Sequence, residues 1–549
     1  MQPFVGLAYW LGGRVSPSRE MPAYATTRSA SLRTASADRY PGRPFGRQEG
    51  TFAASRPSLP LMSTTITADP ASSASAATGR SQRPIRTALV QTYHPYTQFT
   101  HVHPLGIMMI ASTARERGHK DVHILDMKVE DWTPERACEE LERLKPDVVG
   151  LSAMTYEAGC MHELAKLVRA RLPEAVIVCG GPHPSVAADD VMEDAAVDFV
   201  VRGEGEMTFA DVLDGIADGR TDWDGCAGIH WRNAAGQVVA EADRPPPSDL
   251  DEMPFPAWDL VQHPKYHKVP RGGVIYAHKE FATMFSSRAC PWRCTYCHNS
   301  YGKAFRERSA ENVLEEMKLL VEDYGVREFV FMDDIFNFRP ERAKKIARGI
   351  IDAKWKIKLT FPNGFRGDIL DEELVVLLKE AGMYRCMIAV ESAVPRIQKV
   401  MKKNLKIDKV RKIVEFTARQ GVMTHGAFML GFPTETEEEM EATIEWAASS
   451  AFHTAAFFRV IPFKGTELFN QIEHAGFELP TDWSKYEPYQ SQINLSEVEE
   501  DEIYKLRKKA YRRFYWNPKR LFSIFRLIPN KTNMLPFLTL LFARRAYAR

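Results

Sequence analysis

The stretch that decides the fold is Cys290-Pro291-Trp292-Arg293-Cys294-Thr295-Tyr296-Cys297, in which three cysteines follow one another at spacings of four and three residues. Such a loop can turn three thiolates toward one inorganic group. Thiolates are soft ligands that suit iron–sulfur clusters, and three of them on a four-iron cluster leave one iron open to a further ligand. A structural zinc ion is the alternative, with His298 as its fourth ligand. The spacing therefore predicts a metal site and favours an iron–sulfur cluster.

The CxxxCxxC pattern follows an expected strand at 283–288, and in this position it resembles the signature of the radical S-adenosylmethionine (SAM) superfamily. The resemblance implies a [4Fe–4S] cluster held by Cys290, Cys294 and Cys297. It also implies that the open iron binds the amino and carboxylate groups of SAM. Reduction of the cluster by an external flavodoxin- or ferredoxin-like donor would then cleave SAM to a 5′-deoxyadenosyl radical.

The bulk composition is that of an ordinary soluble protein with several domains. The 549 residues are 44% hydrophobic and 26% charged, and the net charge of +1 argues against wholesale binding of nucleic acid. Of the eight cysteines, those outside the loop are scattered, which fits a reducing cytoplasm better than a disulfide framework. No run of 18 apolar residues occurs, so we expect no transmembrane helix.

The N-terminal segment 1–85 is rich in Ser, Ala, Pro, Gly and Arg. Up to Arg86 it contains eleven Arg, no Lys and four acidic residues. Such a composition buries too little apolar surface to offset the entropy of ordering, so we expect a disordered extension. Two alternatives are an organellar transit peptide and a true translation start at Met62.

From residue 86 to 243 short apolar strands alternate with helical segments. This order predicts an α/β domain with a parallel, doubly wound, Rossmann-like sheet that binds ligands at the carboxyl ends of its strands. A β-hairpin at 228–239 would close the domain. The expected strands are 87–91, 122–125, 147–152, 175–181 and 198–202, and the expected helices are 104–118, 133–144 and 163–172.

Four short pieces of this domain and its linker resemble the cobalamin-binding domain that precedes the radical SAM core in one branch of the superfamily. They are 104–106, 180–184, 202–206 and 254–260. The alternative is that the sheet binds nothing and only packs against the core. The resemblance implies that cobalamin is bound, and the candidate contacts are Ser152, Thr155, Gly180, Gly181, His183, Arg202, Gly203 and Glu204.

The lower ligand of cobalt is a point of departure from other cobalamin proteins. Mutases carry DxHxxG, but the nearest string here, Asp121-Val122-His123, lacks the glycine and falls in the second expected strand. We therefore interpret His123 as an ordinary strand residue and expect no histidine ligand from this motif.

After a proline-containing linker at 244–272, the strand–helix alternation resumes over 273–480. Six units predict a partial (β/α)₆ barrel, whose chemistry lies at the carboxyl ends of its strands. The expected strands after 283–288 are 328–332, 358–361, 386–390, 425–430 and 455–462.

Polar residues at these strand ends are the candidates for contact with SAM. Asp333 and Asp334 stand where the superfamily contacts the SAM amino group, Glu391 matches its strand-four acid, and Tyr296 stands where backbone groups hold the adenine. For each acid the alternative is a helix N-cap. Arg366 and Arg459 are more simply explained as ion-paired or solvated than as contacts to an anionic substrate.

The C-terminal region 481–549 is expected to be helical. Ser496 and Glu499 predict a capping box that opens a helix running to about Trp516. Residues 503–549 contain thirteen Lys or Arg, no acid and ten aromatics. This pattern is typical of peripheral contact with an anionic membrane or a lipid-like substrate, whereas the alternative is that the helices cover the open side of the barrel.

Together these features predict a cobalamin-dependent radical SAM enzyme that methylates an unactivated carbon of a small or lipid-like molecule. The alternative is radical cyclisation or rearrangement of a tetrapyrrole, hopanoid or other lipid. Methylthiolation of tRNA is disfavoured, because Cys138, Cys160, Cys179 and Cys226 are too dispersed to hold a second cluster. A non-catalytic cobalamin or redox sensor would not need to cleave SAM.

Overall fold

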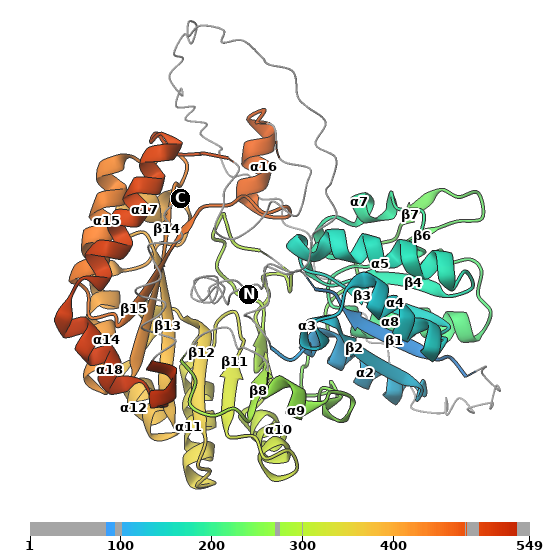
Figure 1. Ribbon diagram of the computed structural model, residues 1–549, viewed down its shortest axis with the longest axis horizontal. Helices are drawn as coiled ribbons and strands as arrows, with labels where there is room; N and C mark the ends of the chain where they lie inside the picture. Colours follow the sequence, from blue (N-terminus) through green and yellow to red (C-terminus); the bar gives the residue numbers. More distant parts are fainter. Residues whose placement is uncertain are drawn as a thin grey trace, which may run out of the picture. The chain divides into compact units, whose positions relative to one another are not determined.

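The computed structural model describes residues 84–93, 102–268, 275–298, 300–477, 479 and 493–534. They contain two large, mainly parallel sheets and one short ribbon (Figure 1). The expectations for 1–83, 480–492 and 535–549 fall outside the described residues. Among the helices that the structure describes, none combines the length and the apolar character needed to cross a bilayer.

The first sheet has seven strands in the order β2-β1-β3-β4-β5-β6-β7. The first five are parallel, and the hairpin β6–β7 is antiparallel. The domain is thus the expected doubly wound α/β sheet with a closing hairpin. Its strands are β1 (Thr87–Gln91), β2 (Val122–Asp126), β3 (Val148–Ser152), β4 (Val176–Gly180), β5 (Phe199–Val201), β6 (Ile229–Arg232) and β7 (Val238–Ala240).

Helices cover both faces of this sheet. Consecutive residues of β1 alternate between two cores: Ala88 and Val90 pack with α4 and α5, whereas Leu89 packs with α2 and α8. Burial on both faces explains why the strands are continuously apolar. The helices are α2 (Leu105–Glu116), α3 (Met127–Glu130), α4 (Pro134–Leu144), α5 (Ala158–Arg171), α6 (Pro182–Val186), α7 (Ala188–Met192) and α8 (Gly205–Ala217).

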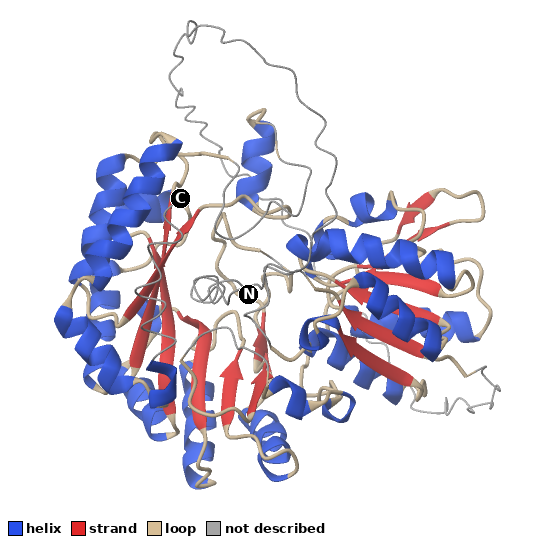
Figure 2. Cartoon of the chain, in the orientation of Figure 1, coloured by secondary structure: helices blue, strands red, loops and turns tan. Residues whose placement is uncertain are grey.

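The second sheet has six parallel strands in the order β15-β14-β13-β12-β11-β8, which is the expected partial barrel. Helices line its outer side (Figure 2). The strands are β8 (Phe281–Met284), β11 (Glu328–Phe331), β12 (Lys358–Phe365), β13 (Met383–Glu391), β14 (Met423–Leu430) and β15 (Thr454–Arg459). The helices are α10 (Ala310–Glu322), α11 (Pro340–Asp352), α12 (Glu372–Glu380), α13 (Pro395–Val400), α14 (Ile407–Arg419), α15 (Glu437–Ser449) and α16 (Glu467–His474).

The strand expected at 283–288 is divided into two. β8 ends at Met284, and the chain then forms β9 (Ser287–Arg288), which pairs antiparallel with β10 (Arg306–Glu307). The cysteine loop is therefore the excursion between the two strands of a short ribbon. The linker before β8 carries the short helix α9 (His263–Tyr266).

The C-terminal region adds α17 (Glu500–Tyr515) and α18 (Pro518–Leu527). The Tyr515 hydroxyl donates to the Ala455 carbonyl on β15 at 2.9 Å, so α17 covers the last strand of the barrel. The predicted capping box is wrong: Glu499 is the N-cap and makes no side-chain cap, and the Ser496 hydroxyl instead bonds Asn494 Oδ1 at 2.8 Å.

Candidate cofactor sites

The three cysteines of the loop line one cavity of about 310 Å³ at the carboxyl ends of the barrel strands. Burial raises the pKa of all three thiols, that of Cys297 to about 12. Within the described ranges no three His, Cys, Asp or Glu side chains converge on a single ion. A cubane takes one thiolate per iron and so needs sulfurs that are spread apart, whereas a zinc ion needs them around one point.

Glu391 ends β13 with a left-handed backbone, φ 65°. Its carboxylate accepts hydrogen bonds from the Tyr296 hydroxyl at 3.2 Å and from Lys403 Nζ at 3.0 Å, and all three side chains line the cysteine cavity. The next helix, α13, has Val394 as its N-cap. Glu391 is therefore not the N-cap of α13. Its carboxylate instead holds the hydroxyl of Tyr296 from the cysteine loop.

The adjacent acids Asp333 and Asp334 have different surroundings. Asp333 accepts from Ser286 N at 3.1 Å, from Ser286 Oγ at 2.7 Å and from Ser287 Oγ, and it lines neither large cavity. Asp334 lines the cysteine cavity, 3.9 Å from His298 Nε2, and burial raises its pKa. The cap of α11 is Arg339, so neither acid caps that helix.

Part of the wall that the later strands form around the cysteine cavity is apolar. Met387, Ala389, Ala427, Met429 and Phe458 face it from β13, β14 and β15. The two arginines of the wall are ion-paired: Arg366 lies 2.8 Å from Asp368 and Arg459 is held by Glu500, as the simpler interpretation expected.

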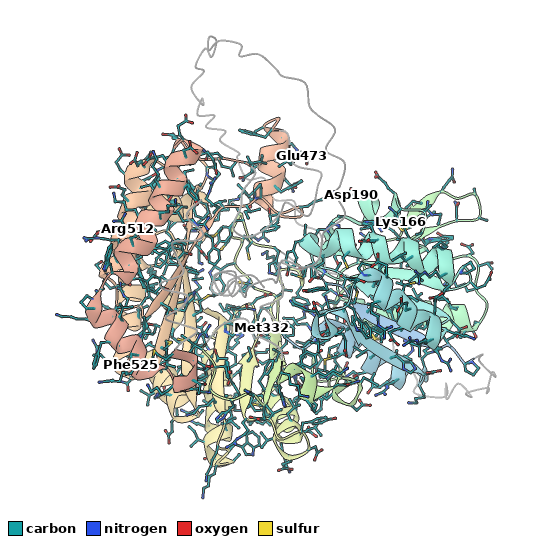
Figure 3. All side chains as sticks on the ribbon, viewed as in Figure 1. Lys166, Asp190, Met332, Glu473, Arg512 and Phe525 are labelled. Carbon is teal, nitrogen blue, oxygen red and sulfur yellow. The ribbon has the colours of Figure 1, made fainter. Side chains whose placement is uncertain are left out.

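A second cavity, of about 260 Å³, lies at the carboxyl ends of β1, β3, β4 and β5. It is also lined by Phe285 and Met332 of the barrel, the latter labelled in Figure 3. The two cavities adjoin, because they share the lining residues Met154, Pro182, Ser300, Tyr301 and Asn363.

Ion pairs join the two domains beside this junction. Arg288 binds Glu204 and Glu206, each at 2.6 Å, and Arg306 also binds Glu204. Arg288 and Arg306 are register partners in β9 and β10, so Glu204 neutralises two cations that would otherwise repel each other. All four side chains are at most 9% exposed. A second link runs from Lys464 to Asp190 at 2.6 Å.

Comparison with known families assigns both domains. The B12-binding domain model matches residues 99–213, and the radical SAM superfamily model matches residues 284–447. An uncharacterized methyltransferase of Pyrococcus horikoshii is 33% identical over 421 residues, which cover 76% of this chain and 89% of the relative. The chain belongs to the radical SAM enzymes that carry a B12-binding domain.

Two further relatives show the range of reactions in this family. The cytidylyl-2-hydroxyethylphosphonate methyltransferase of Streptomyces wedmorensis is 29% identical and covers 69% of this chain and 79% of its own. The anaerobic magnesium-protoporphyrin IX monomethyl ester cyclase of Rubrivivax gelatinosus is 25% identical and covers 75% of this chain and 74% of its own.

Solved structures share the fold. The methyltransferase TsrM of Kitasatospora setae, with cobalamin and a [4Fe-4S] cluster bound, has a TM-score of 0.59 at 19% identity and covers 72% of this chain and 75% of its own. OxsB, with aqua-cobalamin and SAM bound, has a TM-score of 0.63 at 16% identity and covers 85% and 76%. The two family models, and not these distant structures, assign a [4Fe–4S] cluster, SAM and cobalamin as the cofactors of the chain.

Glycines shape the wall and the rim of the second cavity. Between the sheet and α2 it forms an apolar slot in which Gly150 has no side chain: a Cβ there would lie 2.7 Å from Leu89 Cδ2 and 3.4 Å from Phe209. At the rim, Gly181 has φ 94°, and a Cβ would lie 2.9 Å from Ser152 Oγ. Both glycines therefore allow close packing at the cavity wall that a side chain would disrupt.

The sequence-predicted cobalamin contacts divide into three groups. Ser152, Gly180, Gly181, Gly203 and Glu204 line the B12-domain cavity, although Glu204 is committed to the arginines, and Thr155 lines the cysteine cavity instead.

His183 and Arg202 line neither cavity, so the structure does not bring them together with the other candidates, and their contact with cobalamin stays a prediction. His183 is fully buried at the start of α6, and burial lowers its pKa to about 4. Arg202 turns to the closing hairpin and pairs with Asp243 at 2.6 Å. His123 is the expected strand residue, with its ring 2.7 Å from Asp121.

Sequence reasoning missed a polar group in the same cleft. Gln91, Asp126, Lys128 and Glu157 line it where β1, β2 and the turn after β3 end. Burial lowers the pKa of Lys128 and raises that of Glu157 to about 7. The rule that ligands meet the carboxyl ends of parallel strands would have found Gln91 and Asp126, since each is the last residue of its strand.

Proposed function

We propose that this protein transfers a methyl group to an unactivated carbon of a small or lipid-like molecule. The observation that carries the proposal is the junction of the two cavities: the one with the cluster cysteines opens directly beside the one in the B12-binding domain. When bound, the cluster and SAM supply a 5′-deoxyadenosyl radical, and cobalamin supplies the methyl group. A substrate at the junction would meet both.

The roles of the side chains follow from their places. Cys290, Cys294 and Cys297 would hold the cluster, and Asp334 is the better placed of the two acids to accept from the SAM ammonium. Glu391 has Lys403 and Tyr296 as partners, so its orientation is set before any ligand arrives. Ser152, Gly180, Gly181 and Gly203 would form the cradle of cobalamin.

The apolar wall supports a substrate that presents hydrocarbon to the radical. Five side chains, Met387, Ala389, Ala427, Met429 and Phe458, offer no polar atom other than thioether sulfur. The flanking arginines are already neutralised by Asp368 and Glu500. A carbon that lacks activating groups is the target for which radical chemistry is needed.

The partners are part of the same proposal. An external flavodoxin- or ferredoxin-like protein would reduce the cluster. A cytoplasmic location is supported by the eight cysteines, all of which are free, while the C-terminal region would contact a membrane from one side.

The test is anaerobic turnover with SAM whose methyl group is deuterated. Reconstituted protein would be given a chemical reductant and an apolar metabolite extract, with the triple Cys290→Ala, Cys294→Ala, Cys297→Ala variant as control. We expect deoxyadenosine and S-adenosylhomocysteine in equal amounts, together with a product that carries the deuterated methyl group. S-adenosylhomocysteine without deoxyadenosine would contradict the radical step.

The second candidate is radical cyclisation, favoured by the likeness to the Rubrivivax cyclase. It predicts deoxyadenosine with no S-adenosylhomocysteine and a product without the label. The same assay therefore separates the two.

A further inference from the structure

The helix α18 buries an arginine and exposes two phenylalanines, the reverse of what the burial of apolar surface alone would favour. Its cation Arg520 is 7% exposed, whereas Phe522 and Phe525 are 67% and 52% exposed. Trp516, just before the helix, is 79% exposed. Aromatic rings normally supply the buried face of such a helix, and arginine the exposed face. Three large rings in one short segment are thus held out of the core.

The orientation of α18 is fixed by specific contacts. Arg520 donates to the carbonyls of Phe452 at 2.9 Å, Ala448 at 2.8 Å and Ser450 at 2.9 Å, and to that of Phe514. Ile524 is fully buried in the core of the barrel. Rotation of the helix to hide its phenylalanines would leave a buried guanidinium and several carbonyls without partners, which costs more than the burial gains.

Cations surround the exposed rings. The Arg512 guanidinium lies 5.7 Å from the centre of the Trp516 ring, and Lys531 Nζ lies 5.0 Å from that of Phe525. Lys519 and Arg526 are also exposed on α18. Figure 3 labels Arg512 and Phe525 along the same outer edge of the barrel. The aromatic–basic face, as we name it, consists of Arg512, Trp516, Lys519, Phe522, Phe525, Arg526 and Lys531.

The charges of this face are not neutralised as those of its neighbours are. On α17, Lys509 and Arg513 pair with Glu441 and Glu445 of α15. For the four cations of the aromatic–basic face, the described part of the chain supplies no ion pair, and no Asp or Glu occurs anywhere in 503–549. Cations beside exposed aromatic rings suit a partner surface that has anionic groups on the outside and an apolar layer beneath them.

We propose that the aromatic–basic face docks on the surface of an anionic lipid bilayer. The rings of Trp516, Phe522 and Phe525 would enter the boundary between headgroups and acyl chains, and the cations would meet lipid phosphates. A second copy of the chain is the weaker occupant, because two such faces would bring cations against cations. The docking rests on the membrane contact proposed above for the C-terminal region and places the enzyme beside a store of apolar molecules. Vesicle binding tests it without turnover, so its failure would leave the proposed methyl transfer untouched.

The experiment is co-sedimentation of the full chain with vesicles of phosphatidylcholine alone or mixed equally with phosphatidylglycerol. We expect binding to the mixed vesicles only, weakened by salt. The variant Trp516→Ser, Phe522→Ser, Phe525→Ser should bind at least tenfold more weakly, and Lys519→Gln alone about fivefold more weakly, from about 1 kcal/mol per cation near an anionic surface. Phe477→Ser, which removes another exposed ring, should change nothing.

Three results would overturn the proposal. One is equal binding to the two kinds of vesicle. Another is a triple variant that binds as tightly as the parent chain, because the contact would then lie elsewhere. The last is self-association in analytical ultracentrifugation that the triple variant abolishes, which would assign the face to a second copy. Unchanged thermal unfolding of the triple variant would show that the loss is not one of folding, since all three rings are exposed.

Discussion

The cluster loop and the B12-domain cleft are built in different ways. The loop takes its three cysteines from eight consecutive residues, so a local pattern is sufficient to place them. The cleft collects its lining from the ends of several strands between Leu89 and Phe209 and from barrel residues such as Met332. Residues that are neighbours in the sequence have different partners there. In 202–206, Arg202 turns to the hairpin while Glu204 and Glu206 bind arginines of the barrel. A contiguous motif therefore assigns residues, whereas a dispersed one assigns only a region.

The largest effect should come from replacing the three cysteines of the cluster loop. In the triple cysteine-to-alanine variant we expect iron and deoxyadenosine formation to fall below detection, because alanine cannot ligate iron. Cobalamin should still bind, since the three cysteines line only the other cavity. Metal analysis of protein produced with cobalamin reports both cofactors. Joint loss of iron and cobalt would mean that cobalamin binding depends on an intact cluster loop.

The next effect concerns the ion pairs that join the two regions. Arg288→Met leaves Glu204 and Glu206 buried without one of their cations, which should lower the free energy of unfolding by about 3–5 kcal/mol. As control, Lys509→Met breaks an exposed pair with Glu441 and should cost less than about 1 kcal/mol. Urea unfolding measures both. Similar values for the two variants would remove the special role given to Arg288.

Much of the fold could be predicted, because strand and helix periodicities are local and both cores respect them. The different surroundings of Asp333 and Asp334 could not, since they depend on Ser286 and Ser287 folding back to the first acid. The capping box at Ser496 failed for a related reason: Asn494 bonds its hydroxyl before the helix begins. Where several polar partners compete, sequence spacing alone does not decide which one wins.

Asp333 and Asp334 allow a test on single residues, because one is bound by serine side chains and the other lines the cysteine cavity. Asp334→Asn should weaken SAM binding by about 1.5–3 kcal/mol, roughly tenfold to a hundredfold, and leave unfolding unchanged. Asp333→Asn should lower stability by about 1–3 kcal/mol, because an amide cannot accept all the bonds that Ser286 and Ser287 donate. Equilibrium dialysis with SAM and urea unfolding are measured on both variants. Exchange of the two phenotypes would reverse the assignment.

A smaller effect is expected in the cleft. Gly150→Val puts a branched side chain where Leu89 Cδ2 already lies within 2.7 Å of a Cβ, and overpacking of this kind costs about 1–3 kcal/mol. Cobalamin should bind about tenfold more weakly while iron content is retained. In Gly159→Ala, where a Cβ meets nothing within 4 Å, both cofactors should bind normally. Unaltered cobalamin content in Gly150→Val would place the cofactor outside this slot.

The smallest effect is one of pH and lies beside the cluster loop. Burial raises the pKa of Glu435 from 4.5 to about 7, although its carboxylate accepts from the backbone of Gly431 and Phe432, and Phe432 packs against Tyr296. Because the folded protein holds this proton more tightly than the unfolded chain, its contribution to stability is complete below pH 4.5 and is lost as pH rises through 7. Between pH 6 and 8 the loss should be about 1 kcal/mol.

Glu435→Gln has no such proton, so its unfolding free energy should decline less over that interval than that of the parent chain. The control is Glu437→Gln, an exposed acid on α15. If the parent and Glu435→Gln follow parallel curves from pH 4.5 to 8, the carboxylate is already charged in the fold. The hydrogen bonds from Gly431 and Phe432 would then stabilise the charged carboxylate more than burial destabilises it. The stability of the structure beside the cluster loop would in that case not depend on pH over this range.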